Sequence, residues 1–296
     1  MSLPLQSPSQ AGIRHLIIPV IFLILSVSGV LLALAPERVI KGGERRIHRA
    51  WMILNGKLVL VNGHYLRVER KGRGGPTVVF DSGLSQTHST WGSIPDEVAG
   101  KASVIVYERA GVGESDHLKT VGTSSRIVDD LHELLEKTGA PKPYILVGHS
   151  FGGMNIRLFA SRYPNEVSGL LLIDASHEDQ FVRYAELMPS DQRASYLRHE
   201  RGENLEGVNM LASGREVRAA RFGPIPAIIL TAGADRSKTA FDDRERAHLD
   251  LQSELVKRLP GSRQIIAEKS GHFIQKDQPE LVVKSILELA GKTGRN

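Results

Sequence analysis

The stretch Tyr144-Ile-Leu-Val-Gly-His-Ser-Phe-Gly-Gly153 decides how this chain is expected to fold. Its first four residues are an apolar run that is typical of a short buried strand, and the run stops at Gly148. Ser150 follows two residues later, and two more glycines follow the serine. This spacing predicts a strand that turns sharply into a helix and exposes one serine at the bend.

The glycines around this bend have a steric purpose. Gly148 and Gly152 have no Cβ, so the strand and the helix can approach closely on either side of Ser150. The unpaired N–H groups at the start of the helix would face negative charge that develops on a substrate oxygen. A Gly-x-Ser-x-Gly match alone is weak in a chain with 29 glycines, but here a strand pattern precedes it and a helix pattern follows it.

Strand patterns and helix patterns alternate through most of the chain. Asn62-Gly63 separates two alternating segments and predicts a hairpin turn. Apolar runs predict strands at 58–61, 65–69, 76–80, 103–107, 144–147, 170–173, 227–231 and 263–267, and helical spacing marks 125–137, 154–162 and 278–289. This alternation predicts an α/β fold, with a mostly parallel eight-stranded sheet and helices on both faces. Residues 176–223 break the pattern, and we expect this polar stretch to form a lid insertion.

The N-terminus differs in character from the rest. Residues 16–35, LIIPVIFLILSVSGVLLALA, carry no charge. As a helix they would span roughly 30 Å, the thickness of a bilayer's hydrocarbon core. We therefore expect a tail at 1–15 and a transmembrane anchor at 16–35. A cleaved signal peptide is an alternative, because Ala33-Leu-Ala35 matches a cleavage site, although Pro36 is expected to hinder cleavage; a buried soluble helix is a third reading.

A basic connector, residues 36–56, follows the apolar segment. Its charged residues are Arg38, Lys41, Arg45, Arg46 and Arg49, against Glu37 and Glu44. The excess of positive charge after the segment favours a cytoplasmic catalytic domain, with the exported side as the alternative. Trp51 could rest at a membrane interface or pack on the domain.

The composition excludes several classes of protein. The chain has no cysteine, which rules out disulfides, cysteine zinc sites and a cysteine nucleophile. The net charge is +5, but no basic block interleaved with aromatic residues is present, so nucleic acid is not an expected partner. The motifs that hold catalytic metals or nucleotides are also missing from the sequence, so we expect no metal and no cofactor. The sequence leaves the oligomeric state open.

Two kinds of residue are needed to activate Ser150. His272, in Ser270-Gly-His-Phe273, follows the last predicted strand and is the candidate base that takes the serine proton. The carboxylate that orients this histidine is expected to be Asp235, with Asp174 as the alternative acid. Both follow predicted strands, and the order Ser…Asp…His holds for either.

A tetrahedral intermediate also needs two donors to hold its negative oxygen. The backbone N–H of Phe151, directly after the nucleophile, is one candidate. The N–H of Leu84, in the turn after strand 76–80, is the other, and Gly83 allows that turn. These two groups are the predicted oxyanion hole.

With these residues the chain resembles the α/β-hydrolase fold superfamily over about 57–296. The resemblance is carried by Phe80-Asp-Ser-Gly-Leu84, Tyr107-Glu-Arg-Ala-Gly-Val-Gly-Glu-Ser-Asp116, Gly148-His-Ser-Phe-Gly152 and Ser270-Gly-His272. The family usually has Asp where Glu108 stands, and often His-Gly where Ser82-Gly83 stands. Its acid usually follows the seventh strand, as Asp235 does, and in some members the sixth, as Asp174 does. In similar proteins residues such as Arg109 and Ser115 tie down the turn beside the active site.

The resemblance also implies a reaction. Similar dehalogenases and epoxide hydrolases have Asp at the bend, whereas this chain has Ser150. A serine implies an acyl-enzyme, so we expect a serine hydrolase of the esterase or lipase type that acts on small-molecule or lipid-like carboxylic esters. The alternatives are amide or carbon–carbon bond hydrolysis, perhydrolysis, or a ligand-binding protein on the same fold without catalysis.

Overall fold

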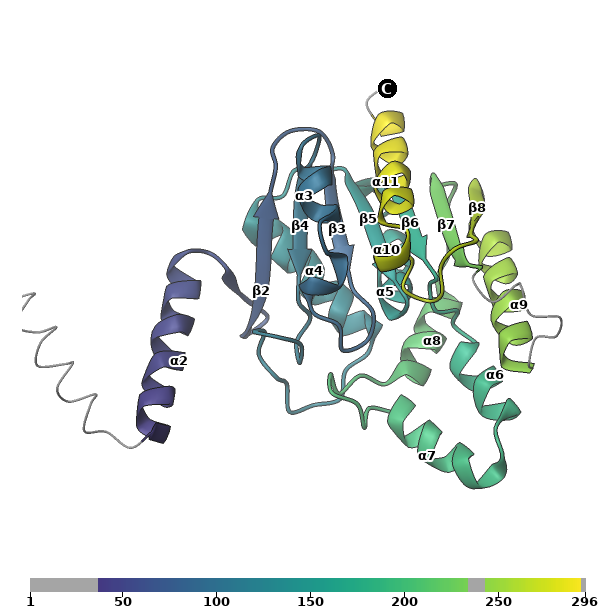
Figure 1. Ribbon diagram of the computed structural model, residues 1–296, viewed down its shortest axis with the longest axis horizontal. Coiled ribbons are helices and arrows are strands. Elements are labelled where there is room, and N and C mark those ends of the chain that lie inside the picture. The colour runs from purple at the N-terminus through teal and green to yellow at the C-terminus, as the bar shows by residue number, and fades with distance from the viewer. Residues whose placement is uncertain (1–36, 234–242, 294–296) are drawn as a thin grey trace, which may run out of the picture. The chain divides into compact units, whose positions relative to one another are not determined.

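The computed structural model describes residues 37–233 and 243–293 (Figure 1). The chain divides into two units, residues 1–55 and 56–296. The first contains helix α2 (Glu37–Leu54), and the predicted tail and anchor lie outside the described residues. Among the helices in the described ranges, none combines the length and apolar character needed to cross a bilayer.

The second unit is built on an eight-stranded sheet, as the sequence predicts. Its strands are β1 (Leu58–Val61), β2 (His64–Lys71), β3 (Thr77–Asp81), β4 (Ser103–Tyr107), β5 (Tyr144–His149), β6 (Val167–Ile173), β7 (Ala227–Ala232) and β8 (Ser262–Ala267). Their order across the sheet is β1-β2-β4-β3-β5-β6-β7-β8. β2 runs antiparallel to both β1 and β4, and every other neighbouring pair is parallel.

The first two strands form the predicted hairpin. Asn62 and Gly63 have φ angles of 46° and 85°, and Val61 pairs with His64 across the turn. Two successive positive φ angles are the mark of a type I′ turn, which matches the twist of the flanking strands. This local prediction is confirmed.

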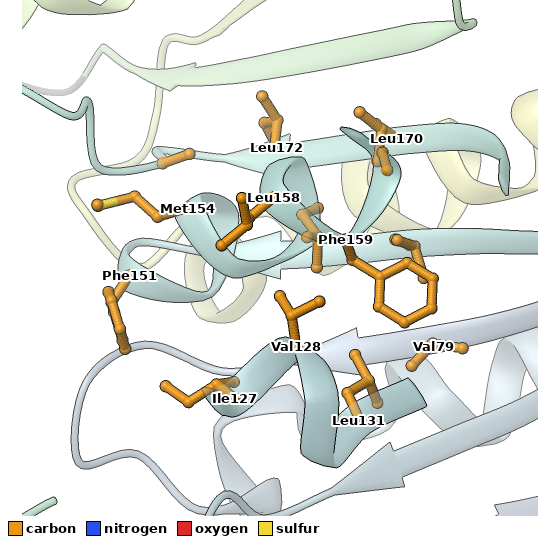
Figure 2. Close-up of a cluster of buried hydrophobic side chains, with 14 of the residues drawn as sticks. Val79, Ile127, Val128, Leu131, Phe151, Met154, Leu158, Phe159, Leu170 and Leu172 are labelled. Carbon is orange, nitrogen blue, oxygen red and sulfur yellow. The ribbon is translucent and has the colours of Figure 1, made fainter. Parts of the chain in front are cut away.

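Two layers of helices cover the sheet, because alternate residues along each strand point to opposite faces. On one face, Val79 and Leu146 face a cluster with α4 (Ser124–Thr138) and α5 (Phe151–Arg162). Figure 2 shows this cluster, in which Leu131 and Phe159 lie near Val79. On the other face, the sheet packs against α3 (Ile94–Ala99) and α11 (Pro279–Thr293), which lie over it in Figure 1. Three short helices lie in the segments that connect the longer elements: η1 (His88–Trp91), η2 (Pro164–Glu166) and α10 (Ile274–Asp277).

The stretch predicted as a lid is more helical than its sequence indicates. Residues 176–223 contain α6 (Gln180–Leu187), α7 (Ser190–Glu200) and α8 (Met210–Ala219), which lie together at one end of the sheet (Figure 1). α6 packs against α9 (Asp243–Arg258), and α8 packs against α4 and α5. These tertiary contacts stabilise helices whose sequence periodicity is weak, and the function of the stretch as a lid stays a prediction.

Candidate active site

The strand β5 ends at a sharp bend, and Ser150 occupies its apex. Ser150 has φ 51° and ψ −120°, a conformation that L-residues rarely adopt, and helix α5 begins at the next residue. A Cβ on Gly148 would lie 2.7 Å from the backbone of Gly152, and a Cβ on Gly152 would overlap the carbonyl oxygen of Asp81. The glycines therefore allow the close packing that keeps Ser150 in this strained conformation.

The loop after β3 lies beside this bend and carries Leu84. Among the described residues, no protein acceptor is recorded for the backbone N–H of Leu84 or of Phe151. Both N–H groups therefore remain able to bind an oxyanion, although their role as its donors stays a prediction.

The buried side chain of Arg109 fixes the shape of this loop. It donates hydrogen bonds to the carbonyl oxygens of Ser82 at 2.6 Å and Gly83 at 2.7 Å. Its guanidinium also pairs with Asp81 and with Glu206. Glu206 in turn accepts a hydrogen bond from the backbone N–H of Ser85. Both ends of the turn that presents Leu84 are thus tied to one buried cation.

The charges in this cluster compensate one another. Burial alone would lower the pKa of Arg109, but the carboxylates of Glu206 and Asp81 outweigh that effect and raise it. Burial raises the pKa of Asp81, while Arg109 and the hydroxyl of Tyr107 oppose the rise. Because every charge here is buried, removal of one partner would leave an unpaired charge inside the protein.

The loop after β8 carries His272. The carboxylate of Asp277 accepts hydrogen bonds from the hydroxyl of Ser270 at 2.9 Å and from the backbone N–H of Gly271 at 3.2 Å. Gly233, at the end of β7, donates its N–H to the carbonyl oxygen of Ser270 at 3.0 Å. The His272 side chain is 45% exposed, and its Nδ1 lies 2.7 Å from Asp174 Oδ2.

Asp174, directly after β6, is buried and both of its carboxylate oxygens are bound. Oδ1 accepts hydrogen bonds from the backbone N–H of Ala232 and from Nε2 of His248, each at 3.0 Å. Burial alone would raise the pKa of Asp174, but its hydrogen bonds with His248 and His272 outweigh burial and hold it well below its usual range. Asp174 is therefore ionised at neutral pH. The preferred acid of the sequence analysis, Asp235, lies outside the described residues.

His149, the residue before Ser150, connects the bend to the loop that carries His272. Nε2 of His149 donates to the backbone carbonyl of His272 at 2.8 Å, and the two rings lie 4.7 Å apart. Burial, together with His272, lowers the pKa of His149 to about 4, so this ring is neutral at physiological pH. The hydroxyl of Ser150 has no recorded hydrogen-bond partner in the part of the chain that the structure describes. The bend and the His272 loop nevertheless meet through His149.

The two departures from the family's usual pattern are accommodated locally. The carboxylate of Glu108 accepts the N–H of Glu114 at 2.9 Å and lies 2.7 Å from Nδ1 of His88. Ser82 accepts the indole N–H of Trp91 at 2.9 Å. Ser115 donates to the carbonyl oxygen of Glu108, which fits the structural role expected for it.

Three residues of this site escaped sequence reasoning. Glu206 lies in the polar stretch after α7, and no motif singles it out. His248 is one of eleven histidines and lies on a helix with no catalytic pattern. His149 lies within the Gly148-His-Ser150 motif, and its position beside Ser150 is the signal in the sequence that points to it.

Two groups of side chains in the described residues could hold a metal by distance alone. They are His132, Glu136 and Glu166, and His177, Asp179 and Glu254. In the first, Lys142 lies 2.7 Å from Glu136 and 2.8 Å from Glu166. In the second, Arg183 lies 2.9 Å from Glu254, and Arg218 pairs with Asp179. Protein cations already compensate these carboxylates, so neither group supports a metal site, and a mechanism without metal stays a prediction.

The chain is similar to a known protein family and to known relatives. Residues 76–221 match the family model for the alpha/beta hydrolase fold. A Bacillus subtilis protein, YqjL, whose function is uncharacterized, is 27% identical over 245 residues, which cover 81% of this chain and 92% of the relative.

Solved structures agree with this fold. An esterase from Thermogutta terrifontis superposes with a TM-score of 0.57 at 21% identity, covering 79% of this chain and 97% of the esterase. An epoxide hydrolase from Vigna radiata superposes with a TM-score of 0.60 at 15% identity, covering 79% and 97% of the two chains. At these identities the superpositions establish the architecture and leave the reaction open.

The buried cluster around Arg109 predicts a strong stability effect. Arg109→Met should destabilise the protein by about 3–5 kcal/mol, because Asp81 and Glu206 lose their shared cation. The difference in unfolding free energy between Arg109→Met and the wild type should become smaller as the pH falls. A buried carboxyl group whose pKa is raised in the folded state opposes folding when it is ionised, and this penalty disappears as the pH falls below the pKa of the unfolded chain. Urea unfolding at several pH values measures this.

Arg198→Met, at an exposed pair with Glu203, is the control, with an expected change within about 0.5 kcal/mol. A similar loss for both variants would contradict the prediction.

Proposed function

We propose that this chain, which has the alpha/beta hydrolase fold, is a serine hydrolase that works through an acyl-enzyme. Ser150 is the nucleophile, His272 the base and Asp174 the carboxylate that orients the base. The observation that carries the proposal is the 2.7 Å contact between His272 Nδ1 and a buried, ionised Asp174. A second link, from His149 to the His272 backbone, brings that pair to the bend that exposes Ser150.

The contact with Asp174 prepares His272 as a base. A carboxylate accepts hydrogen bonds only, so Nδ1 of His272 must carry the hydrogen. In the neutral ring, Nε2 then keeps its lone pair, and Nε2 is the atom that must take the serine proton. The partial exposure of His272 leaves this ring accessible to substrate.

The proposed reaction uses these groups in turn. Ser150 Oγ attacks the carbonyl carbon while its proton passes to His272 Nε2, and the N–H groups of Phe151 and Leu84 stabilise the resulting oxyanion. Collapse of the intermediate breaks the bond to the leaving alcohol, which receives the proton from His272. Water then attacks the acyl-enzyme with the help of the same imidazole and releases the acid and free Ser150.

Carboxylic esters, including lipid-like esters, are the substrates that this machinery favours. The proposal rests on the nucleophile, because a serine at the bend implies an acyl intermediate on a carbonyl compound. The relatives fit a hydrolase on this fold, since one structural neighbour is an esterase and another an epoxide hydrolase. Amide or carbon–carbon bond hydrolysis and perhydrolysis use the same parts, and a ligand-binding protein without catalysis is the remaining alternative.

We also propose that this enzyme works at a membrane. Residues 16–35 are the proposed anchor, and α2 follows them in the chain. On α2, Ile47, Trp51 and Leu54 are 71%, 47% and 86% exposed and are spaced along one helix face. Arg45 and Arg49 occupy the opposite face. An apolar face beside a basic face is the pattern of a helix that lies in the surface of an anionic bilayer.

The proposed nucleophile is tested by covalent labelling. A fluorophosphonate probe should label the full-length protein, and Ser150→Ala should abolish both labelling and the hydrolysis of short p-nitrophenyl esters. Ser253→Ala changes an exposed serine on α9 and should label like the wild type. A folded wild-type protein that neither labels nor turns over these esters would favour the binding-protein alternative.

The proposed acid is tested by two matched substitutions. Asp174→Asn should lower kcat by a factor on the order of 10⁴, because the amide no longer holds the correct tautomer of His272 or stabilises its charged form. Asp235→Asn should have a much smaller effect. Steady-state kinetics near pH 8 measure both, with circular dichroism as a check of folding. The reverse ranking would assign the role to Asp235.

The membrane proposal is tested in cells. The full-length protein should stay in the membrane fraction after an alkaline carbonate wash. The double variant Leu23→Asp/Val27→Asp should move to the soluble fraction, since each aspartate at the centre of a span costs about 2.5–3.5 kcal/mol of insertion free energy. Release of the wild type by the same wash would contradict an anchor at 16–35.

A further inference from the structure

The carboxylate of Asp174 serves two imidazoles. Its Oδ2 lies 2.7 Å from Nδ1 of His272, and its Oδ1 lies 3.0 Å from Nε2 of His248. The two histidines come from different parts of the fold, since His248 lies on α9 and His272 follows β8. A catalytic dyad needs one imidazole on the carboxylate, so the second one is unexplained by the proposed mechanism.

The surroundings of His248 fit both of its protonation states. Its Nδ1 lies 3.3 Å from the hydroxyl of Tyr184, on the lid-segment helix α6. When His248 is neutral, Nε2 donates a hydrogen bond to Asp174 and Nδ1 accepts one from the Tyr184 hydroxyl. When His248 is charged, Nδ1 donates to the tyrosine oxygen instead, because a hydroxyl is both donor and acceptor. His248 can therefore gain a proton with only a rotation of the Tyr184 hydroxyl hydrogen.

Among the described residues, the other charged groups near His248 have partners of their own. On its own helix, the guanidinium of Arg244 lies 4.6 Å from the centre of the Tyr184 ring. Glu254, further along α9, pairs with Arg183 of α6 at 2.9 Å. From β6 and from the loop after β8, the groups that face this position are Asp174 and His272. Asp174 is therefore the carboxylate that His248 contacts directly.

We propose that His248 is a positioning residue that shares the negative charge of Asp174 with His272 and so keeps His272 an active base at lower pH. This inference rests on the proposed function. One carboxylate stabilises the first imidazolium beside it more than the second, so two such histidines titrate as a coupled pair. A proton on His248 uses part of the stabilisation that Asp174 would otherwise give to charged His272. His272 then loses its lone pair at a lower pH than it would with Asp174 to itself.

The test replaces His248 with a residue that keeps a donor but carries no charge. His248→Gln should lower the alkaline plateau of kcat/KM only moderately, and should move the acid limb of its pH profile upward by about one unit. Below the limb this shift amounts to about tenfold less activity than the wild type. His117→Gln, which changes an exposed histidine in a loop, should leave the profile unchanged.

A second measurement separates this inference from the proposed function. In Ser150→Ala protein, which does no chemistry, NMR follows the titration of the His272 ring directly. Adding His248→Gln to that variant should raise the titration midpoint of His272 by a similar amount. An unchanged midpoint overturns the inference whether or not the protein is a hydrolase. Activity that survives in Ser150→Ala overturns the proposed function and leaves the coupling of the two histidines to be decided by the NMR result.

Discussion

The close approach of β5, α5 and the end of β3 is the constraint on which the site depends. Gly152 lies so near the Asp81 carbonyl that no side chain fits between them, and a Cβ on Gly148 would lie 2.7 Å from the backbone of α5. This packing keeps Ser150 in a conformation that serine does not favour by itself. The same contact holds the bend close to the loop that carries Leu84, so one steric arrangement positions the proposed nucleophile and both proposed oxyanion donors.

Buried charge gives this arrangement its rigidity. Arg109 and Asp174 are both almost fully buried. Arg109 is paired with the carboxylates of Asp81 and Glu206, and Asp174 accepts hydrogen bonds from His248 and His272. Burial of an unpaired charge is expensive, so each group restricts its neighbours to a narrow set of positions. Arg109 thereby holds the loop that carries Leu84, and Asp174 holds His272. These two buried residues lie on opposite sides of Ser150 in the sequence, since Arg109 follows β4 and Asp174 follows β6.

Much of the architecture could be predicted because its signals are local. Apolar runs marked all eight strands, and Asn62-Gly63 marked the hairpin that the structure contains. The lid segment was harder to predict, since α6, α7 and α8 are stabilised by packing against other helices and their own periodicity is weak. Glu206 shows the same limit in the site: its partner Arg109 is 97 residues away in the chain, and no local pattern connects them.

The sequence by itself determined the elements, the bend and the identity of the nucleophile and base candidates, because each depends on residues that are neighbours in the chain. It left two acids open, Asp235 and Asp174, since both follow strands and both precede His272. Only the tertiary structure decided which groups surround Asp174. The parallel register of β6, β7 and β8 brings the ends of these strands to one edge of the sheet, where Asp174 meets His272 and His248. That meeting depends on distances across the sheet, which no spacing along the chain specifies.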